Sequence, residues 1–270
     1  MALGVLNNIS AVYAENNLNQ TQAGLQKTLT QLSSGSRINS GADDAAGLSL
    51  ANGLEASSSA LTQSASNASE GVDFLQVADG ALSQVTNLLN RAVTLATEAS
   101  NGVLNTSQDT AADAEYQNIL TEIGNIDTNT EYNGINVFST AASIFTSDGT
   151  TNQTDSATAL GSVVTAAGLA GTSLTSTTNA QAALTKITTA IGSIASERGT
   201  AGASINTLQA VSSVMNTEAT NTLSAENDVT ATDYGQASSD LSKYEILMQT
   251  GISALAQANS TQQLVTKLLQ

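Results

Sequence analysis

Apolar side chains recur at alternating three- and four-residue intervals in two long stretches of the chain. The first stretch covers residues 75–103 and the second covers 184–215, where only Arg198 and Ser212 interrupt the stripe. Heptad-like spacing of this kind is typical of long helices packed side by side. The second stripe predicts a helix over about 180–228, which would be roughly 70 Å long and far longer than an ordinary globular helix.

Both ends of the chain carry similar stripes. Near the N-terminus four apolar residues are spaced by seven positions, and Leu29 adds a fifth between two of them. Near the C-terminus the apolar positions follow the same 3-4 alternation as the long stretches. We therefore expect the two ends to form partner helices. The N-terminal positions are Ala11, Leu18, Leu25, Leu29 and Leu32, and the C-terminal ones are Leu241, Tyr244, Met248, Gly251, Leu255, Ala258, Gln262, Val265 and Leu269.

Shorter elements are predicted between the long stripes. Apolar residues in 116–126 indicate an amphipathic helix that returns antiparallel to the first long helix after a polar loop at 101–108. The Asn-Gly pair in 132–138, followed by alternating apolar residues, predicts a β-hairpin, and residues 147–150 resemble a second turn. In 139–178, 18 of 40 residues are Ser or Thr and none is Lys or Arg, which indicates a small exposed insert.

The composition excludes many kinds of chemistry. The chain has 270 residues and contains no Cys, His, Pro or Trp. It therefore has no thiolate or imidazole nucleophile or base, no zinc site with His or Cys ligands, and no disulfide. No Gly-Lys dipeptide is present for a phosphate-binding loop. The absence of proline favours long unbroken helices, and we expect a mainly α, elongated bundle or coiled coil without catalytic, cofactor or metal sites.

Charge is spread unevenly along the chain. The net charge is −16, from 7 basic and 23 acidic residues, which argues against nucleic-acid binding. Residues 1–42 and 241–270 each carry +1, so the residues between them carry −18. This distribution is expected if the ends meet each other or other copies while the middle faces water.

Two groups of acidic residues could suggest metal ligands. Asp43 and Asp44 precede an Ala-rich helical run, and helix capping accounts for them better than a metal or an acid–base pair. Asp148, Asn152 and Asp155 loosely resemble a calcium loop but lack its glycine and terminal Glu. A solvated turn is the better interpretation.

Arg91 is one of only 7 basic residues, and the next one along the chain is Lys186. It is either an ordinary ion-pair partner on an acidic surface or a recognition residue, because Arg is enriched at interface hot spots. The sequons at 105–107 and 152–154 are expected by chance in a chain so rich in Asn, Ser and Thr.

The end stripes pose an energetic problem, because two helices with modest apolar side chains bury little surface as a pair. Self-assembly solves it, since a repeated non-closing contact between identical subunits builds a helical filament. We expect the ends of isolated monomers, about 1–40 and 235–270, to be mobile and to order on assembly. The residues expected to carry self-assembly are Leu18, Leu25, Leu29, Leu32, Leu241, Tyr244, Met248, Leu255, Val265 and Leu269.

The N-terminus lacks a basic region, a continuous apolar stretch and a cleavage site of the signal-peptide kind. No segment approaches 18 consecutive apolar residues. The sequence predicts no classical leader and no membrane span, which leaves the cytoplasm or export by a route without leader cleavage.

Several motifs together resemble bacterial flagellin. Residues 31–52 read QLSSGSRINSGADDAAGLSLAN, and the likeness continues through NASEG at 67–71, EASNG at 98–102 and YNG at 132–134. It resumes near the C-terminus with ISALAQAN at 252–259. The resemblance covers roughly residues 1–138 and 180–270, in the order found in the family.

This resemblance implies a filament subunit for swimming motility. The paired chain ends, 1–42 and 233–270, would form the inner core called D0. Residues 43–138 and 180–232 would form the surrounding D1 layer, and 139–179 would be a reduced variable segment. Members of the family leave the cell through the flagellar type III export apparatus with a chaperone on the C-terminal segment, and they fold beneath a cap at the filament tip. This route accounts for an extracellular protein without a cleaved leader.

The family is also recognised by a Toll-like receptor of vertebrate innate immunity. Leu89, Asn90 and Arg91, together with Glu115, correspond to its receptor-contact residues, although Asn90 stands where Gln is usual. Val93 and Thr94 replace a charged pair.

Three alternatives remain beside the filament subunit. A hook-filament junction adaptor shares the end motifs but normally carries a different middle. A metalloprotease insert, known in some flagellins, needs His, which this chain lacks. Residues 139–178 could also act as an adhesin or carry O-linked glycans.

Overall fold

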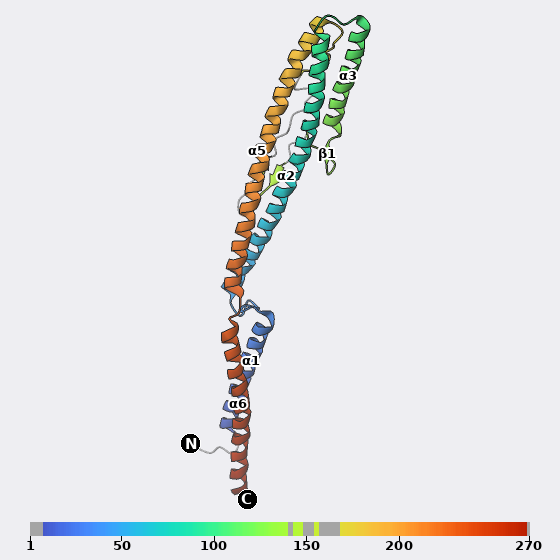
Figure 1. Ribbon diagram of the computed structural model, residues 1–270. Helices are drawn as coiled ribbons and strands as arrows, with labels where there is room; N and C mark the ends of the chain where they lie inside the picture. The colour runs from blue at the N-terminus through green and yellow to red at the C-terminus, as the bar shows by residue number, and fades with distance from the viewer. Residues whose placement is uncertain (1–7, 140–142, 148–153, 157–167, 269–270) are drawn as a thin grey trace. The chain divides into compact units, whose positions relative to one another are not determined.

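The computed structural model describes residues 8–139, 143–147, 154–156 and 168–268. Within these ranges it is mainly helical (Figure 1), as the sequence predicts. The helices are α1 (Ile9–Ser34), α2 (Ala45–Ala99), α3 (Thr106–Asn129), α5 (Thr177–Thr230) and α6 (Tyr234–Leu268). The strands are β1 (Glu131–Tyr132), β2 (Ile135–Asn136), β3 (Ser143–Phe145) and β4 (Thr154–Ser156).

The chain divides into two compact units, which are described separately. Unit 1 contains residues 1–56 and 222–270, and unit 2 contains residues 57–221. In unit 1 the helices α1 and α6 lie side by side and antiparallel, since Asn8 contacts Ala258 near one end and Thr232 contacts Gln31 near the other. The sequence prediction of partner helices at the chain ends is confirmed.

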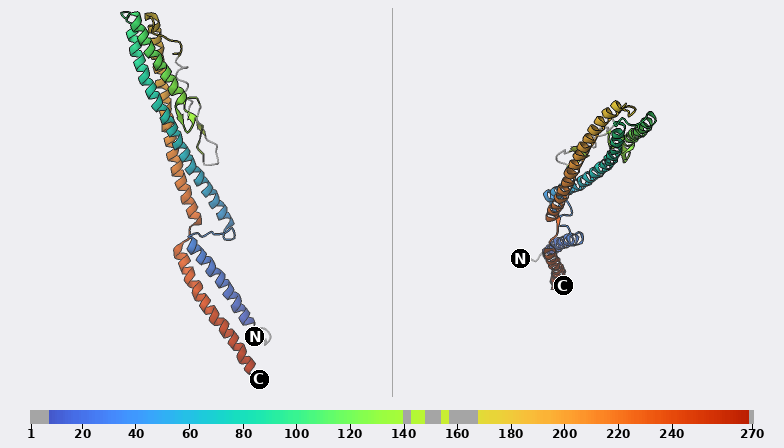
Figure 2. Two further views of the ribbon diagram at one scale, coloured as in Figure 1. Left: turned by 90° about the vertical axis from the view of Figure 1, so that its right-hand side faces the viewer. Right: turned by 45° about the horizontal axis from the view of Figure 1, so that its top comes forward.

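Unit 2 is built on the antiparallel pair of α2 and α5, with α3 alongside (Figure 2). Its apolar core comes from the predicted stripes: Leu75, Leu82, Leu89, Ile187 and Ile194 are all almost completely buried. The predicted helix over 180–228 is confirmed as α5. Tyr116, Ile119 and Ile123 of α3 are also buried, so the amphipathic helix predicted after the first long one is confirmed as well.

The two residues that interrupt the second stripe both contact α2. Arg198 forms an ion pair with Asp79, and the Ser212 hydroxyl donates to the Ala65 carbonyl at 3.4 Å. The hydroxyl of Ser58 makes a third contact, to the carbonyl of Ala219. In an antiparallel helix pair, one residue number falls as its partner's rises, so the two numbers of a contact keep a constant sum while the register is unchanged. All three contacts have the same sum. The helices therefore keep one antiparallel register along this whole length.

The prediction for the end of the first long helix is wrong at Val103. Helix α2 ends at Ala99, and Gly102 follows with a φ of +69°, a left-handed conformation that commonly terminates helices. Val103 is consequently 76% exposed instead of packed in the stripe. The following loop is also shorter than 101–108, because Asn105 caps α3.

The predicted hairpin is present. Strands β1 and β2 pair antiparallel with Tyr132 opposite Ile135, so the turn contains only Asn133 and Gly134. Both turn residues have positive φ, at 52° and 76°, as a type I′ turn requires. Strands β3 and β4 also pair antiparallel. Of the second predicted turn and the calcium-like triad, residues 148–150 and 152 lie outside the described residues.

Within the described ranges, none of the helices combines the length and the apolar character that crossing a membrane would require. The same part of the chain holds no group of three or more acidic residues arranged to bind a metal ion.

Candidate assembly surface

Most of the predicted self-assembly residues lie between the two end helices. Side chains from both helices meet along the α1–α6 contact, where each is half-buried. Leu29 lies at the edge and is 47% exposed, Leu269 lies outside the described residues, and the side chain of Val265 is not described. The half-buried residues are Leu18, Leu25, Leu32, Leu241, Tyr244, Met248 and Leu255.

Two glycines allow these helices to approach closely. A Cβ atom added at Gly24 of α1 would lie 2.6 Å from Cζ of Tyr244, and one added at Gly251 of α6 would lie 3.3 Å from Cδ1 of Leu18. Each glycine therefore accommodates a large side chain of the opposite helix. The sequence stripe included Gly251 but missed Gly24, because the residue opposite it could not be known from spacing.

Polar contacts fix the start of α1 against α6. The Asn8 side chain accepts a hydrogen bond from the Ala11 amide at 3.1 Å, which caps the helix, and its Nδ2 donates to the Ala258 carbonyl at 3.1 Å. One asparagine therefore both begins α1 and holds it to its partner.

At the other end of the α1–α6 pair, the segment after α1 (residues 35–44) pairs with the segment before α6 (residues 231–233). Ser36 and Ala231 form an antiparallel bridge. The Arg37 amide donates to the Thr230 carbonyl at 2.7 Å, and the Thr232 amide donates to the Gly35 carbonyl at 3.0 Å. These two hydrogen bonds satisfy one backbone donor in each segment.

The Asp43–Asp44 pair has two different structural roles. Asp44 accepts from the Gly47 amide at 2.9 Å, so it caps the start of α2 as predicted. Asp43 instead accepts from the backbone and hydroxyl of Ser40 and forms an ion pair with Lys27 of α1 at 2.8 Å. Hydrogen bonds from Lys27 and then Ser40 lower the pKa of Asp43 to about 2.

The end helices also expose large apolar side chains that the stripe analysis missed. They lie off the 3-4 stripe that faces the partner helix. Ile246 is the most prominent on α6, at 63% exposed. The residues are Ile9, Val12 and Tyr13 on α1, and Tyr234, Ile246, Leu247, Ile252 and Leu264 on α6.

The residues matched to receptor contacts lie in unit 2, on α2 and α3. Arg91 Nε and Glu115 Oε1 are 2.7 Å apart, and both side chains are exposed. The hydrogen bond from Arg91 lowers the pKa of Glu115. Asn90 is exposed beside them, whereas Leu89 is fully buried in the helical core. The structure therefore brings Arg91 and Glu115 together, leaves Asn90 exposed and buries Leu89 in the core; receptor contact stays a prediction.

Comparisons with known proteins match most of the chain. Residues 5–143 match the bacterial flagellin N-terminal helical region, and residues 184–269 match the C-terminal helical region. A flagellin of Listeria innocua is 30% identical over 280 residues, which cover 97% of this chain and 98% of the relative. Flagellin 1 of Proteus mirabilis is 39% identical over 139 residues, covering 52% of this chain and 38% of that protein.

A solved structure has a similar fold over part of this chain. The crystal structure of Bacillus cereus flagellin has 29% sequence identity and a TM-score of 0.52, and the match covers 60% of this chain and 94% of that one. Nothing among these relatives favours the hook-filament junction adaptor over the filament subunit. The chain belongs to the bacterial flagellin family and is a structural, non-enzymatic subunit of the flagellar filament.

Proposed function

We propose that copies of this chain join through the α1–α6 pair of unit 1. The observation that carries the proposal is the incomplete burial of this pair: its facing leucines are only half-buried, while Ile246 and Leu264 of α6 are more than half exposed. In unit 2 the equivalent stripe residues, such as Leu82 and Leu89, are fully buried.

The physical reason is the small area that two helices can bury against each other. A fully buried Leu or Ile contributes about 1.5 to 3 kcal/mol, and that contribution is not complete in an isolated α1–α6 pair. Neighbouring copies would cover the exposed side chains. The ends, at a net charge of +1 each, add little repulsion to such a contact.

Seeded elongation of purified monomers tests this proposal. Ile246→Ser removes an exposed apolar side chain without touching the α1–α6 contact, and we expect it to raise the critical monomer concentration about tenfold. Gln249→Ser, at an exposed position one turn away, is the matched control and should elongate like the unaltered chain. Equal elongation of Ile246→Ser and the unaltered protein would contradict the proposal.

Hydrogen exchange gives a second readout of the same proposal. Amides of α1 and α6 should exchange rapidly in monomers and become protected in filaments, because assembly supplies the missing burial. Strong protection of both helices in the monomer would be inconsistent with folding coupled to assembly.

We propose that the chain reaches the cell exterior through the flagellar type III export apparatus, with a chaperone on its C-terminal segment and a cap protein at the filament tip. Membership of the flagellin family supports this route. A strain that lacks the apparatus should retain the protein inside the cell. Export of the protein from that strain would refute the route.

We also propose that Asn90, Arg91 and Glu115 support recognition by the vertebrate Toll-like flagellin receptor, with Leu89 holding the surface from below. The exposed ion pair between Arg91 and Glu115 supports this proposal. Arg91→Ala should reduce stimulation of receptor-bearing cells, whereas Lys186→Ala, which removes another exposed cation of unit 2, should not. An Arg91→Ala variant as active as the unaltered chain would exclude the role.

We also propose how the chain divides between the layers of the filament. The inner core would contain residues 1–42 and 233–270, the surrounding layer residues 43–138 and 180–232, and a reduced variable segment residues 139–179.

O-linked glycans on residues 139–178 would appear as excess mass in peptides from that segment. If every peptide from this segment has the mass calculated from its sequence, glycosylation of the segment is excluded.

A further inference from the structure

The dipeptide Asn-Gly occurs three times in the chain, at residues 52–53, 101–102 and 133–134. Its chemistry is distinctive because glycine has no side chain to shield its backbone nitrogen, which can attack the side-chain amide of the preceding asparagine. All three asparagines are exposed, so access to water does not distinguish them. The backbone that carries each pair does.

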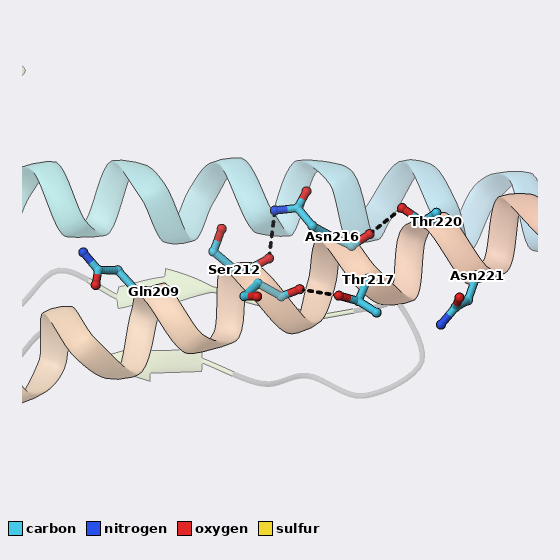
Figure 3. Close-up of a pocket in the computed structure, with 7 residues that line it drawn as sticks. Gln209, Ser212, Asn216, Thr217, Thr220 and Asn221 are labelled. Atoms are coloured by element: carbon cyan, nitrogen blue, oxygen red, sulfur yellow. Dashed lines mark hydrogen bonds between the residues drawn. The ribbon is translucent and has the colours of Figure 1, made fainter.

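Helix α2 holds the first pair in an unreactive geometry. Asn52 lies inside α2 (Ala45–Ala99), where the Gly53 amide is engaged by the carbonyl four residues earlier and the backbone dihedrals are fixed. Attack on the Asn52 side chain would require the helix to open there. Asn216 of α5, on the wall of a groove of about 630 Å³ (Figure 3), is held further by its side chain, whose Nδ2 donates to the Ser212 carbonyl at 2.9 Å.

The hairpin turn leaves the third pair much less constrained. Asn133 and Gly134 are the two turn residues between β1 and β2, and each of these strands is only two residues long. Within the described part of the chain, no hydrogen bond engages the Gly134 amide. A ladder this short opens at little cost, so the Gly134 nitrogen can reach the Asn133 side chain without the loss of a helical hydrogen bond.

The remaining pair, Asn101–Gly102, follows the end of α2. It lies between two helices and not between paired strands, so a change in its backbone has no strand register to disturb. The hairpin pair is therefore the one whose reaction has a defined structural consequence.

We propose that Asn133 is a self-modification site, which converts spontaneously to aspartate and isoaspartate in the folded protein. The Gly134 nitrogen gives its proton to hydroxide and bonds to Cγ of Asn133. The Cγ–Nδ2 bond breaks, and ammonia leaves after taking a proton from water. Water then opens the resulting five-membered imide. Attack at Cγ gives aspartate, whereas attack at the backbone carbonyl carbon leaves the chain running through Cγ, which is isoaspartate.

The two products affect the hairpin differently. Aspartate adopts the left-handed conformation of Asn133, whose φ is 52°, about as readily as asparagine does, so it adds a negative charge and keeps the turn. Isoaspartate adds a methylene to the backbone, and a two-residue turn then no longer holds Tyr132 opposite Ile135. The Tyr132 ring packs edge-on against Phe74, with centroids 6.1 Å apart, so this contact of unit 2 is disturbed as well.

Peptide mass analysis of the native chain tests the proposal. The protein is incubated at mildly alkaline pH, which promotes attack, and is digested at mildly acidic pH with a protease that cuts after glutamate. The pairs fall in separate peptides, because Glu55 and Glu98 lie between the first two and Glu115 and Glu131 lie between the last two. Since a helix interior opens less often than a turn, we expect Asn133 to react about tenfold faster than Asn52 or more, with isoaspartate among the products.

The unfolded chain is the matched control. In denaturant Asn52 and Asn133 should react at similar rates, because both are followed by glycine and neither is held by the fold. Equal rates at these two positions in the native protein would overturn the proposal. Reaction of Asn133 in denaturant alone would overturn it as well.

Amide exchange gives a readout of the structural consequence. The Val137 amide donates to the Thr130 carbonyl at 3.1 Å beside the hairpin. Protein that contains isoaspartate at position 133, separated by ion exchange, should lose protection at Val137, whereas Asn133→Asp, which supplies only the charge, should retain it. Equal protection in the isoaspartate form and the unaltered chain would contradict the proposed effect on the hairpin.

Discussion

Arg198 of α5 and Asp79 of α2 form a two-point ion pair, with Nε 2.7 Å from Oδ1 and Nη2 3.2 Å from Oδ2. Arg198 occupies a position that the apolar stripe would otherwise fill. The ion pair is accommodated at this position because both side chains lie at the edge of the helix pair and remain 37% exposed. The pair marks the same register as the contacts of Ser58 and Ser212, so polar residues within the stripe help to fix how α2 and α5 align.

Breaking this ion pair should destabilise unit 2 modestly. Asp79→Asn should lower the free energy of unfolding by about 0.5 to 1 kcal/mol, because partly exposed pairs are screened by solvent. The corresponding fall in Tm is about 1 to 4 °C, measured by calorimetry. A double-mutant cycle with Arg198→Met should show coupling between the two sites; strictly additive effects would mean that the pair contributes nothing.

The carboxylate of Asp43 should titrate well below its ordinary range. Its pKa is about 2, chiefly because of the hydrogen bond from Lys27. A depressed pKa means that this contact stabilises the folded loop fully above pH 4 or so and that the contribution is lost as pH falls through about 2. An NMR titration of the Asp43 carboxyl should show this, and Lys27→Met should raise the observed pKa; an identical pKa in both proteins would contradict the assignment.

Adding a methyl group at Gly24 should loosen the end helices. In Gly24→Ala the new Cβ would lie 2.6 Å from the Tyr244 ring, which has to move, and overpacking of this kind costs about 1 to 3 kcal/mol. Amide exchange of α1 and α6 in assembled filaments should accelerate. The control is Gly192→Ala in α5, where the Cβ meets open space and the change should stabilise the helix by about 0.5 to 1 kcal/mol.

A second substitution shows whether the contact with Tyr244 is the cause. Combining Gly24→Ala with Tyr244→Leu should relieve the clash and recover part of the lost protection. If the double variant exchanges faster than Gly24→Ala alone, the close approach does not explain the effect.

The start of α3 depends on a reciprocal cap. Asn105 Oδ1 accepts from the Gln108 amide at 3.0 Å, and Gln108 Oε1 accepts from the Asn105 amide at 2.9 Å. Asn105→Ala should cost about 1 kcal/mol of stability and lower the Tm by about 2 to 4 °C. Asn105→Asp keeps an acceptor at the cap and should melt close to the unaltered protein; equal melting of all three would show that the cap is unimportant.

Sequence patterns were sufficient to predict the helices and the pairing of the chain ends, but not the individual contacts between them. The stripe around Leu82 and Leu89 predicted a packed face, and both residues are fully buried. The spacing could not show that Gly24 would face Tyr244, nor that Lys27 would reach Asp43, because these contacts depend on how separate segments pack. Val103 continued the stripe in sequence, yet the left-handed turn at Gly102 directs it to solvent.

The sequence by itself determined which parts of this chain are helical, which faces are apolar and where charge is absent, because these properties depend on local spacing and composition. Only the tertiary structure decided how completely each stripe is buried. In unit 2 the stripes of α2 and α5 share a core with α3, and stripe residues such as Leu82, Leu89 and Ile187 are fully buried. In unit 1 the same kind of stripe on α1 meets only α6, and a pair of helices covers only one side of each, which leaves the remaining apolar surface for other copies to bury.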